Sequence, residues 1–226
     1  MDNYSGKNIQ ITKGSASLRL KEILMDSDGL LTIVKLNFLF LVTTLPVIPF
    51  FILITGGPAI TALLYCTNKL VRTGSISDVS KTYFNIFKTY FKKTLAVGAI
   101  VTVMNIIFIS GLVLYLSMST ANIMYIPFSS ASLIGIIFLW AITIHLFPAF
   151  TEADKSTKEM LADAISAAVL KVKETLIAVV ISLLLIGGII LMLPKSLPLL
   201  LTVVFSVPAV AAGFAHSDCE FISDII

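Results

Sequence analysis

Residues 95–151 read LAVGAIVTVMNIIFISGLVLYLSMSTANIMYIPFSSASLIGIIFLWAITIHLFPAFT and contain no Asp, Glu, Lys or Arg in 57 positions. One crossing of the roughly 30 Å hydrocarbon core of a bilayer takes about 20 residues of α-helix, so this stretch is long enough for two crossings. Its most polar part, SMSTANIMYIPFSS at 117–130, lies in the middle. The sequence therefore predicts a helical hairpin with crossings at 95–117 and 129–150.

Two further apolar blocks flank this hairpin. Residues 30–67 carry a single charge, Lys35, and are interrupted by Pro46, Pro49 and Gly56-Gly57-Pro58. Because proline lacks a backbone donor and suits the first turn of a helix, we expect one arm over about 30–45 and a second with Pro58 at its first position. The second arm would begin between Phe50 and Pro58 and end near Arg72. Residues 175–215 form another pair of crossings, broken by LPKSLP at 193–198.

The composition excludes a water-soluble globular domain. Of 226 residues, 57% are hydrophobic and 13% are charged, and the mean hydropathy is +0.99. The apolar runs are continuous rather than alternating, which excludes a transmembrane β-barrel. We therefore expect an all-α polytopic membrane bundle of six transmembrane helices in three hairpins. Five is the alternative, with one long first crossing and the second arm lying in the interface.

The domain plan and the cysteines follow from the same sequence. A polar cytoplasmic segment, 1–29, precedes a single integral membrane domain over 30–226. The net charge of +3 is too small to indicate a nucleic-acid partner. Cys66 and Cys219 form neither a CxxC pair nor a disulfide framework, so we interpret them as small buried side chains.

Lysine and arginine predict the orientation, because cytoplasmic connections carry the basic excess. The connection 69–93 holds six basic residues and one acid, whereas 118–128 holds no charge. The first is predicted to lie inside and the second outside, which places 152–174 and both termini in the cytoplasm.

Both predicted inner connections have helical periodicity. Over 78–93, Lys81, Lys88 and Lys92 oppose an aromatic stripe, a pattern typical of an interfacial helix with its rings at the acyl boundary. The stripe consists of Val79, Tyr83, Phe84, Phe87, Tyr90 and Phe91. Over 156–174, apolar and small residues predict one helix that packs on protein. Such amphipathic helices either anchor a bundle or expose a docking surface to a partner.

Few side chains could carry chemistry. His145, His216 and Glu220 match neither HExxH nor paired cysteines, so we assign no catalytic, cofactor-binding or metal site. No acidic residue lies in a predicted crossing, which argues against a proton-coupled pump. Lys35, near the cytoplasmic start of the first helix, is expected to snorkel to the headgroups. Asn37 suits a hydrogen bond between helices, and the glycine-rich second arm could line a cavity.

Three motifs, KLNFLFLVTTLPVIP, TGGPAITALLY and FNIFKTYFKKTLAVG, resemble the YesL-like family of bacterial integral membrane proteins, domain of unknown function 624. The resemblance covers about residues 30–100. The matching positions are Asn37, Leu45, Pro46, Gly57, Pro58, Ala59, Leu63, Tyr65, Phe87, Lys88, Phe91 and Lys92. The chain departs from the family pattern in the longer stretch VIPFFILITG between Leu-Pro and Gly-Pro-Ala. The resemblance implies a bacterial cytoplasmic membrane protein without a settled activity, in a family often encoded beside sugar-uptake transporters and glycan-degrading enzymes.

Three functional hypotheses follow. The first is a non-enzymatic accessory or regulatory protein linked to carbohydrate uptake, whose partners are the lipid bilayer and transporter subunits or a second copy of the chain. The second is a small solute carrier or channel with its path near Asn37, Thr44 and the Gly56-Gly57-Pro58 break. The third is a membrane enzyme that uses His145 and the cluster from His216 to Glu220.

Overall fold

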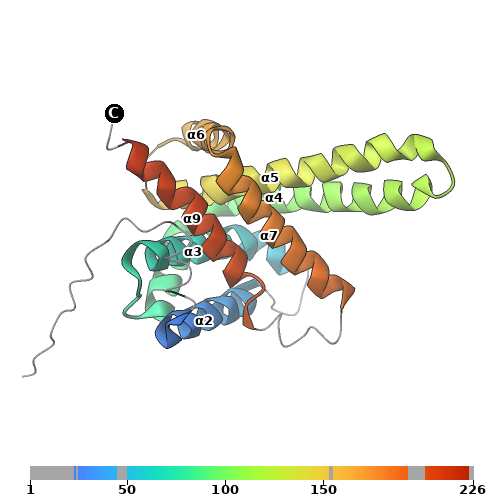
Figure 1. Ribbon diagram of the computed structural model, residues 1–226. Helices are drawn as coiled ribbons and strands as arrows, with labels where there is room; N and C mark the ends of the chain where they lie inside the picture. The colour runs from blue at the N-terminus through green and yellow to red at the C-terminus, as the bar shows by residue number, and fades with distance from the viewer. Residues whose placement is uncertain (1–22, 24, 45–49, 153–154, 193–201, 224–226) are drawn as a thin grey trace, which may run out of the picture.

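The computed structural model describes residues 23, 25–44, 50–152, 155–192 and 202–223. The regular elements in these ranges are all helical, which confirms the all-α class. The elements are α2 (Ser27–Thr44), α3 (Phe50–Thr73), α4 (Val79–Ser119), the short 3-10 helix η1 (Ile123–Tyr125), α5 (Ile126–Glu152), α6 (Thr157–Leu170), α7 (Val172–Leu191) and α9 (Ser206–Ser223) (Figure 1).

The hairpin predicted at 95–151 is present and dominates the shape of the molecule. α4 and α5 run side by side and project beyond the other helices as a long arm (Figure 1). Large apolar side chains cover this arm, with Ile100 64% exposed and Ile134 65% exposed. A surface of this kind is stable in lipid and unfavourable in water.

Three described helical segments are long and apolar enough to cross a membrane: Ser27–Thr44, Val79–Ser119 and Ile123–Thr151. The chain thus has the helices of a membrane protein. The choice between six and five crossings stays a prediction.

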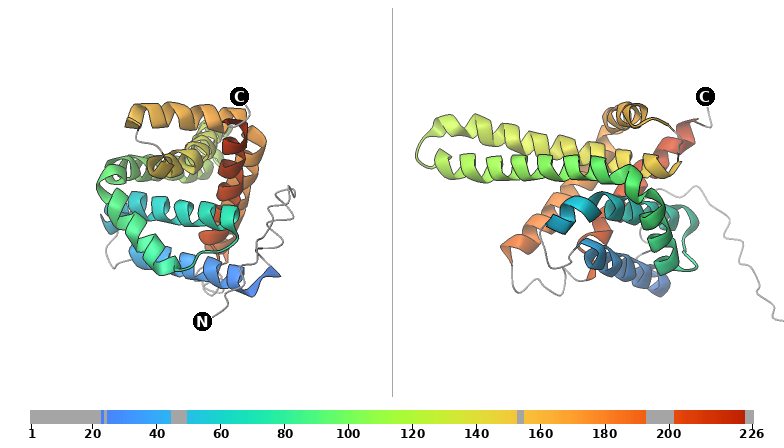
Figure 2. Two further views of the ribbon diagram at one scale, coloured as in Figure 1. Left: turned by 90° about the vertical axis from the view of Figure 1, so that its left-hand side faces the viewer. Right: turned by 180° about the vertical axis from the view of Figure 1, so that it is seen from behind.

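The separate interfacial helix expected over 78–93 is wrong. These residues are the first turns of α4, which continues without interruption for 41 residues into the crossing. No proline or glycine separates Lys93 from the apolar run, so the helical hydrogen bonds continue. The hydroxyls of Thr94 and Thr102 bond to the carbonyls of Tyr90 and Gly98, a pattern that bends helices. Figure 2 shows α4 changing direction along its length.

The two helices predicted for the first hairpin are present, although α3 is not among the three segments named above, and one boundary is corrected. α2 ends at Thr44, and α3 begins at Phe50, within the expected interval. Pro58, however, lies inside α3 rather than at its first position. A proline within a helix forfeits the hydrogen bond from its own nitrogen, but its fixed φ is compatible with the helix. Pro46, which was expected to mark the break, lies outside the described residues.

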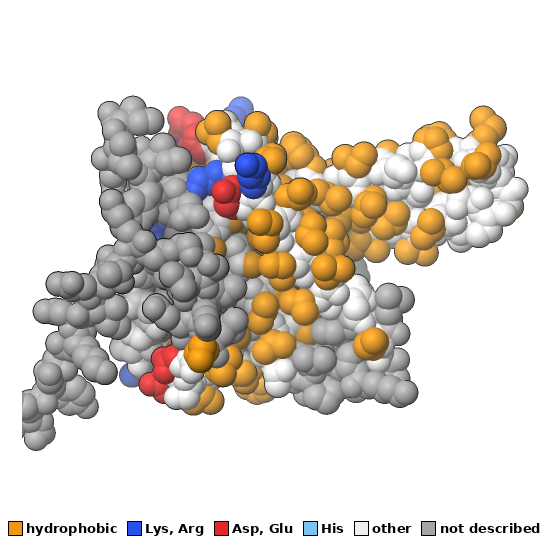
Figure 3. Space-filling view, in the orientation of Figure 1, with side chains coloured by type: hydrophobic (Ala, Val, Ile, Leu, Met, Phe, Trp, Pro, Cys, Tyr) orange, Lys and Arg blue, Asp and Glu red, His pale blue; other side chains and the backbone are white. Residues whose placement is uncertain are grey.

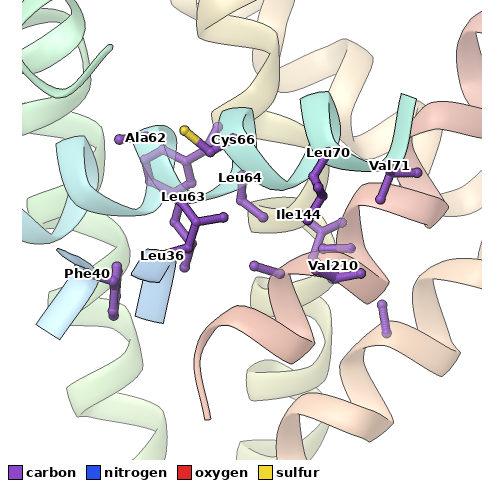
Figure 4. Packing of buried hydrophobic residues seen from close by; sticks show 14 of the residues in the cluster. Leu36, Phe40, Ala62, Leu63, Leu64, Cys66, Leu70, Val71, Ile144 and Val210 are labelled. Carbon is purple, nitrogen blue, oxygen red and sulfur yellow. The ribbon is translucent and has the colours of Figure 1, made fainter. Parts of the chain in front are cut away.

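α3 lies at the centre of the core. Its buried side chains include Leu63, Leu70 and Cys66, which pack among residues of α2, α5 and α9 such as Leu36 (Figure 4). The prediction of a buried Cys66 is confirmed. The side chain of Cys219 lies outside the described part of the molecule.

The single helix expected over 156–174 is in fact two helices. α6 begins with a capping box between Ser156 and Glu159 and ends at Leu170, because Lys171 leaves the helical conformation with φ −114° and ψ 41°. α7 starts at the next residue and runs away from α6 (Figure 1). Met160, Ala164 and Ala168 are buried as expected, whereas Leu161 and Ala162 are exposed. The connection at 193–198 lies outside the described residues.

Candidate functional site

The Gly-Pro-Ala motif of α3 lies at a crossing with α4. A Cβ atom added to Gly57 would lie 2.4 Å from the Thr94 carbonyl oxygen, and one added to Gly98 would lie 2.3 Å from the Gly57 Cα. The two backbones therefore touch, and neither position has room for a side chain. Close approach of this kind strengthens packing between helices in lipid, where the hydrophobic effect contributes little. Gly57 is a packing residue rather than part of a cavity wall.

Tyr83 ties this crossing to α2. Its side chain is fully buried, although the sequence placed it on a stripe facing lipid. The phenol oxygen lies 2.9 Å from the Thr43 hydroxyl and donates to the Ala59 carbonyl over 3.4 Å. Buried Ala59 thus supplies the backbone carbonyl for a contact that joins α2, α3 and α4.

Asn37 connects the first and last described helices. Its side chain is fully buried, and its carbonyl oxygen accepts from the backbone N–H groups of Phe205 at 2.8 Å and Ser206 at 3.2 Å. Ser206 is the first residue of α9, so Asn37 satisfies donors that a helix leaves unpaired at its N-terminus. This confirms the expected hydrogen bond between helices. Lys35 is exposed, as snorkelling requires, and lines a small pocket together with Asp78.

The lysine and aromatic side chains of α4 differ in exposure, as their periodicity predicts. Lys88 and Lys92 are exposed, while Phe87 and Phe91 are half-buried with their ring centroids 5.6 Å apart. The centroid of the Phe87 ring lies 6.5 Å from that of Tyr83. The aromatic stripe therefore begins in the protein core and emerges at the surface along α4.

A second constellation, which we call the buried polar cluster, consists of His145, Lys171, Thr175 and His216. The fold brings the two histidines together, with ring centroids 5.9 Å apart. His145 Nε2 lies 2.9 Å from the Thr175 hydroxyl. Lys171 lies one helical turn before Thr175, and its Nζ has no hydrogen-bond partner among the described residues. The side chain of Glu220, which was considered together with the histidines, lies outside the described part of the chain.

The signals for several of these residues are weak in the sequence alone. Lys171 lay on the polar face of an expected helix, and Thr175 stood at the start of an apolar block. Gly98 carried no signal of its own, and the aromatic stripe that includes Tyr83 did not indicate a contact with α2 or α3, because only the fold shows which helices these residues touch. In the described part of the chain, no three His, Cys, Asp or Glu side chains form a group that could hold a metal ion.

These helices, with their exposed apolar surface and interlocked interior, are those of an all-helical membrane protein. Within that class, residues 33–117 match the family model described as "Protein of unknown function, DUF624". The resemblance seen in the motifs is thereby confirmed, and the matched range holds most of α2, all of α3 and nearly all of α4. Neither the curated proteins nor the solved structures gave a match.

Proposed function

We propose that this protein is a non-enzymatic accessory or regulatory component of the bacterial cytoplasmic membrane that contacts a subunit of a carbohydrate transporter. The carbohydrate link comes from the family resemblance. The contact itself is argued from α6, the short helix that lies across one end of the molecule (Figures 1 and 2).

The observation that carries this proposal is the second apolar face of α6. One face of the helix, at Met160, Ala164 and Ala168, is buried. The other exposes Leu161 at 42% and Val169 at 61%. The remaining members of this exposed stripe are Ile165 and Leu170. Burial of such an apolar stripe against a helix of a partner protein is more favourable than its exposure to water.

The distribution of charge supports the orientation that this role requires. On the face drawn in Figure 3, the acidic and basic side chains lie near α6 and near the beginning of α2, and the projecting hairpin shows none. The hairpin tip points away from the end where α2 begins and α9 finishes (Figure 1). A charged end in water and a bare hairpin in lipid agree with cytoplasmic termini.

The positions suggested for a solute path do not favour the carrier hypothesis. Asn37 caps α9, Thr44 is buried and donates to the Phe40 carbonyl, and Gly57 abuts Gly98. Each is occupied by contacts within the protein, so we do not propose a path there.

Co-purification tests the proposal. The full chain, expressed in its native host, is extracted in mild detergent, and transporter subunits that accompany it are quantified by mass spectrometry. We expect the pair of changes Leu161→Ser and Val169→Ser to abolish recovery of the transporter. The change Ile134→Ser on the exposed hairpin is the matched control and should leave it intact. Recovery of wild-type protein without transporter subunits contradicts the proposal, and so does equal recovery with the α6 variant.

A further inference from the structure

The buried polar cluster contains a cationic side chain that has no acceptor in the described part of the chain. Lys171 is only 9% exposed, and its Nζ has no hydrogen-bond partner among the described residues. An ammonium group removed from water is strongly unfavourable unless an anion or several acceptors compensate for it. A residue in this state therefore points to a negatively charged ligand.

The neighbours of Lys171 are donors suited to oxygen atoms. The carbonyl of Lys171 accepts from the backbone N–H of Thr175 at 3.0 Å, so the two residues are successive on one face at the start of α7. The Thr175 hydroxyl meets His145, which is 2% exposed and has an Nδ1 atom that makes no hydrogen bond with the described residues. His216 of α9 lies against His145, and both His216 and Lys171 act electrostatically on it.

We propose that Lys171, Thr175, His145 and His216 bind a phosphate group. The oxygens of a phosphate accept from an ammonium and from either a hydroxyl or an imidazole N–H, and α5, α7 and α9 bring these groups together. Because His145 and Thr175 are hydrogen-bonded to each other, one of the two donates to the other and the remaining donor faces the phosphate. The phosphate can come from a soluble phosphate or phosphoester, or from the headgroup of an anionic lipid. This site is separate from the exposed stripe of α6 and does not depend on the proposed transporter contact.

The first experiment measures phosphate binding to the full chain in neutral detergent micelles. Inorganic phosphate is titrated by calorimetry at constant ionic strength, with chloride as the control anion. We expect saturable binding that Lys171→Met weakens at least tenfold. The matched control is Lys173→Met, two residues away at an exposed position, which should leave the binding unchanged.

The second experiment distinguishes the lipid source. Native mass spectrometry of protein from mixed phosphatidylglycerol and phosphatidylcholine nanodiscs measures how much phosphatidylglycerol is retained. Retention that Lys171→Met abolishes, without binding of inorganic phosphate, identifies the headgroup as the ligand. Binding of inorganic phosphate identifies a soluble one. Absence of both in the wild-type protein overturns the proposal, as does weakening of less than tenfold in Lys171→Met.

Two further readouts separate binding from a purely structural role. Because Lys171→Met removes an unpaired buried charge, it should not lower the melting temperature in the absence of phosphate, and it should eliminate the rise that phosphate causes in the wild type. If this variant fails to fold, Thr175→Val removes only the hydroxyl and should weaken binding several-fold. Undiminished phosphate binding in folded Thr175→Val would count against the site.

Discussion

The crossing of α3 and α4 predicts opposite outcomes for glycine-to-alanine changes at adjacent residues. At Gly57 a new Cβ would lie 2.4 Å from the Thr94 carbonyl oxygen, whereas at Gly56 it would meet nothing closer than the Thr102 hydroxyl at 3.6 Å. To reach an ordinary contact distance, α3 and α4 must separate by about 1 Å. Overpacking of this kind costs about 1–3 kcal/mol, and alanine recovers at most about 1 kcal/mol through its helix propensity.

We therefore expect Gly57→Ala to lose about 2 kcal/mol of unfolding free energy, while Gly56→Ala is neutral or slightly stabilised. Gly98→Ala, with a Cβ only 2.3 Å from the Gly57 Cα, should behave like Gly57→Ala. Gly188→Ala is a second control, since none of the described residues lies within 4 Å of its added Cβ. The assay is equilibrium unfolding of the purified chain in mixed detergent micelles. Equal stability of Gly56→Ala and Gly57→Ala would refute the backbone contact.

Other contacts predict smaller effects. Asn37→Ala should lower the unfolding free energy by about 1–3 kcal/mol because it leaves buried N–H groups of α9 unpaired, whereas the same change at exposed Asn85 should have little effect in the same assay. Tyr83→Phe should cost about 1 kcal/mol through its lost hydrogen bonds, and Tyr90→Phe should not. The Glu159 carboxylate accepts from the N–H of the α6 N-cap, which lowers its pKa from 4.5. Its contribution to the first turn of α6 is thus present above pH 4.5 and lost as the pH falls through the lowered pKa. The amide protection factors in that turn, which are corrected for the intrinsic pH dependence of exchange, should therefore fall with acid in the wild type but not in Glu159→Gln.

The crossings could be predicted because their signal is local. A stretch without charge and with a polar centre already specifies two helices and a turn in lipid, and the arm of α4 and α5 matches it. The continuity of α4 could not be predicted in the same way. The change from an amphipathic to an apolar pattern near Lys93 indicates a change of surroundings, and a helix can pass through that change without ending.

The site residues show the same limit. Periodicity placed Tyr83 on an apolar face but could not show that α2 and α3 cover that face. Gly56-Gly57-Pro58 is a local signal for a helix start, yet the partner that makes Gly57 necessary lies 41 residues further along the chain at Gly98. His145 and His216 come together only through the packing of α5 on α9. Contacts between distant segments depend on the whole fold, and a single sequence does not display them.

The Asn37 cap also bears on how the protein is made. Its acceptor belongs to the first described helix, and the Phe205 donor is synthesised 168 residues later. During translation the Asn37 carbonyl oxygen cannot accept these hydrogen bonds until α9 has been synthesised. A polar group without partners is unfavourable in a membrane. In a chain that stops short of α9, the Asn37 carbonyl oxygen lacks the donors of Phe205 and Ser206, so this contact between α2 and α9 forms only after α9 has been inserted.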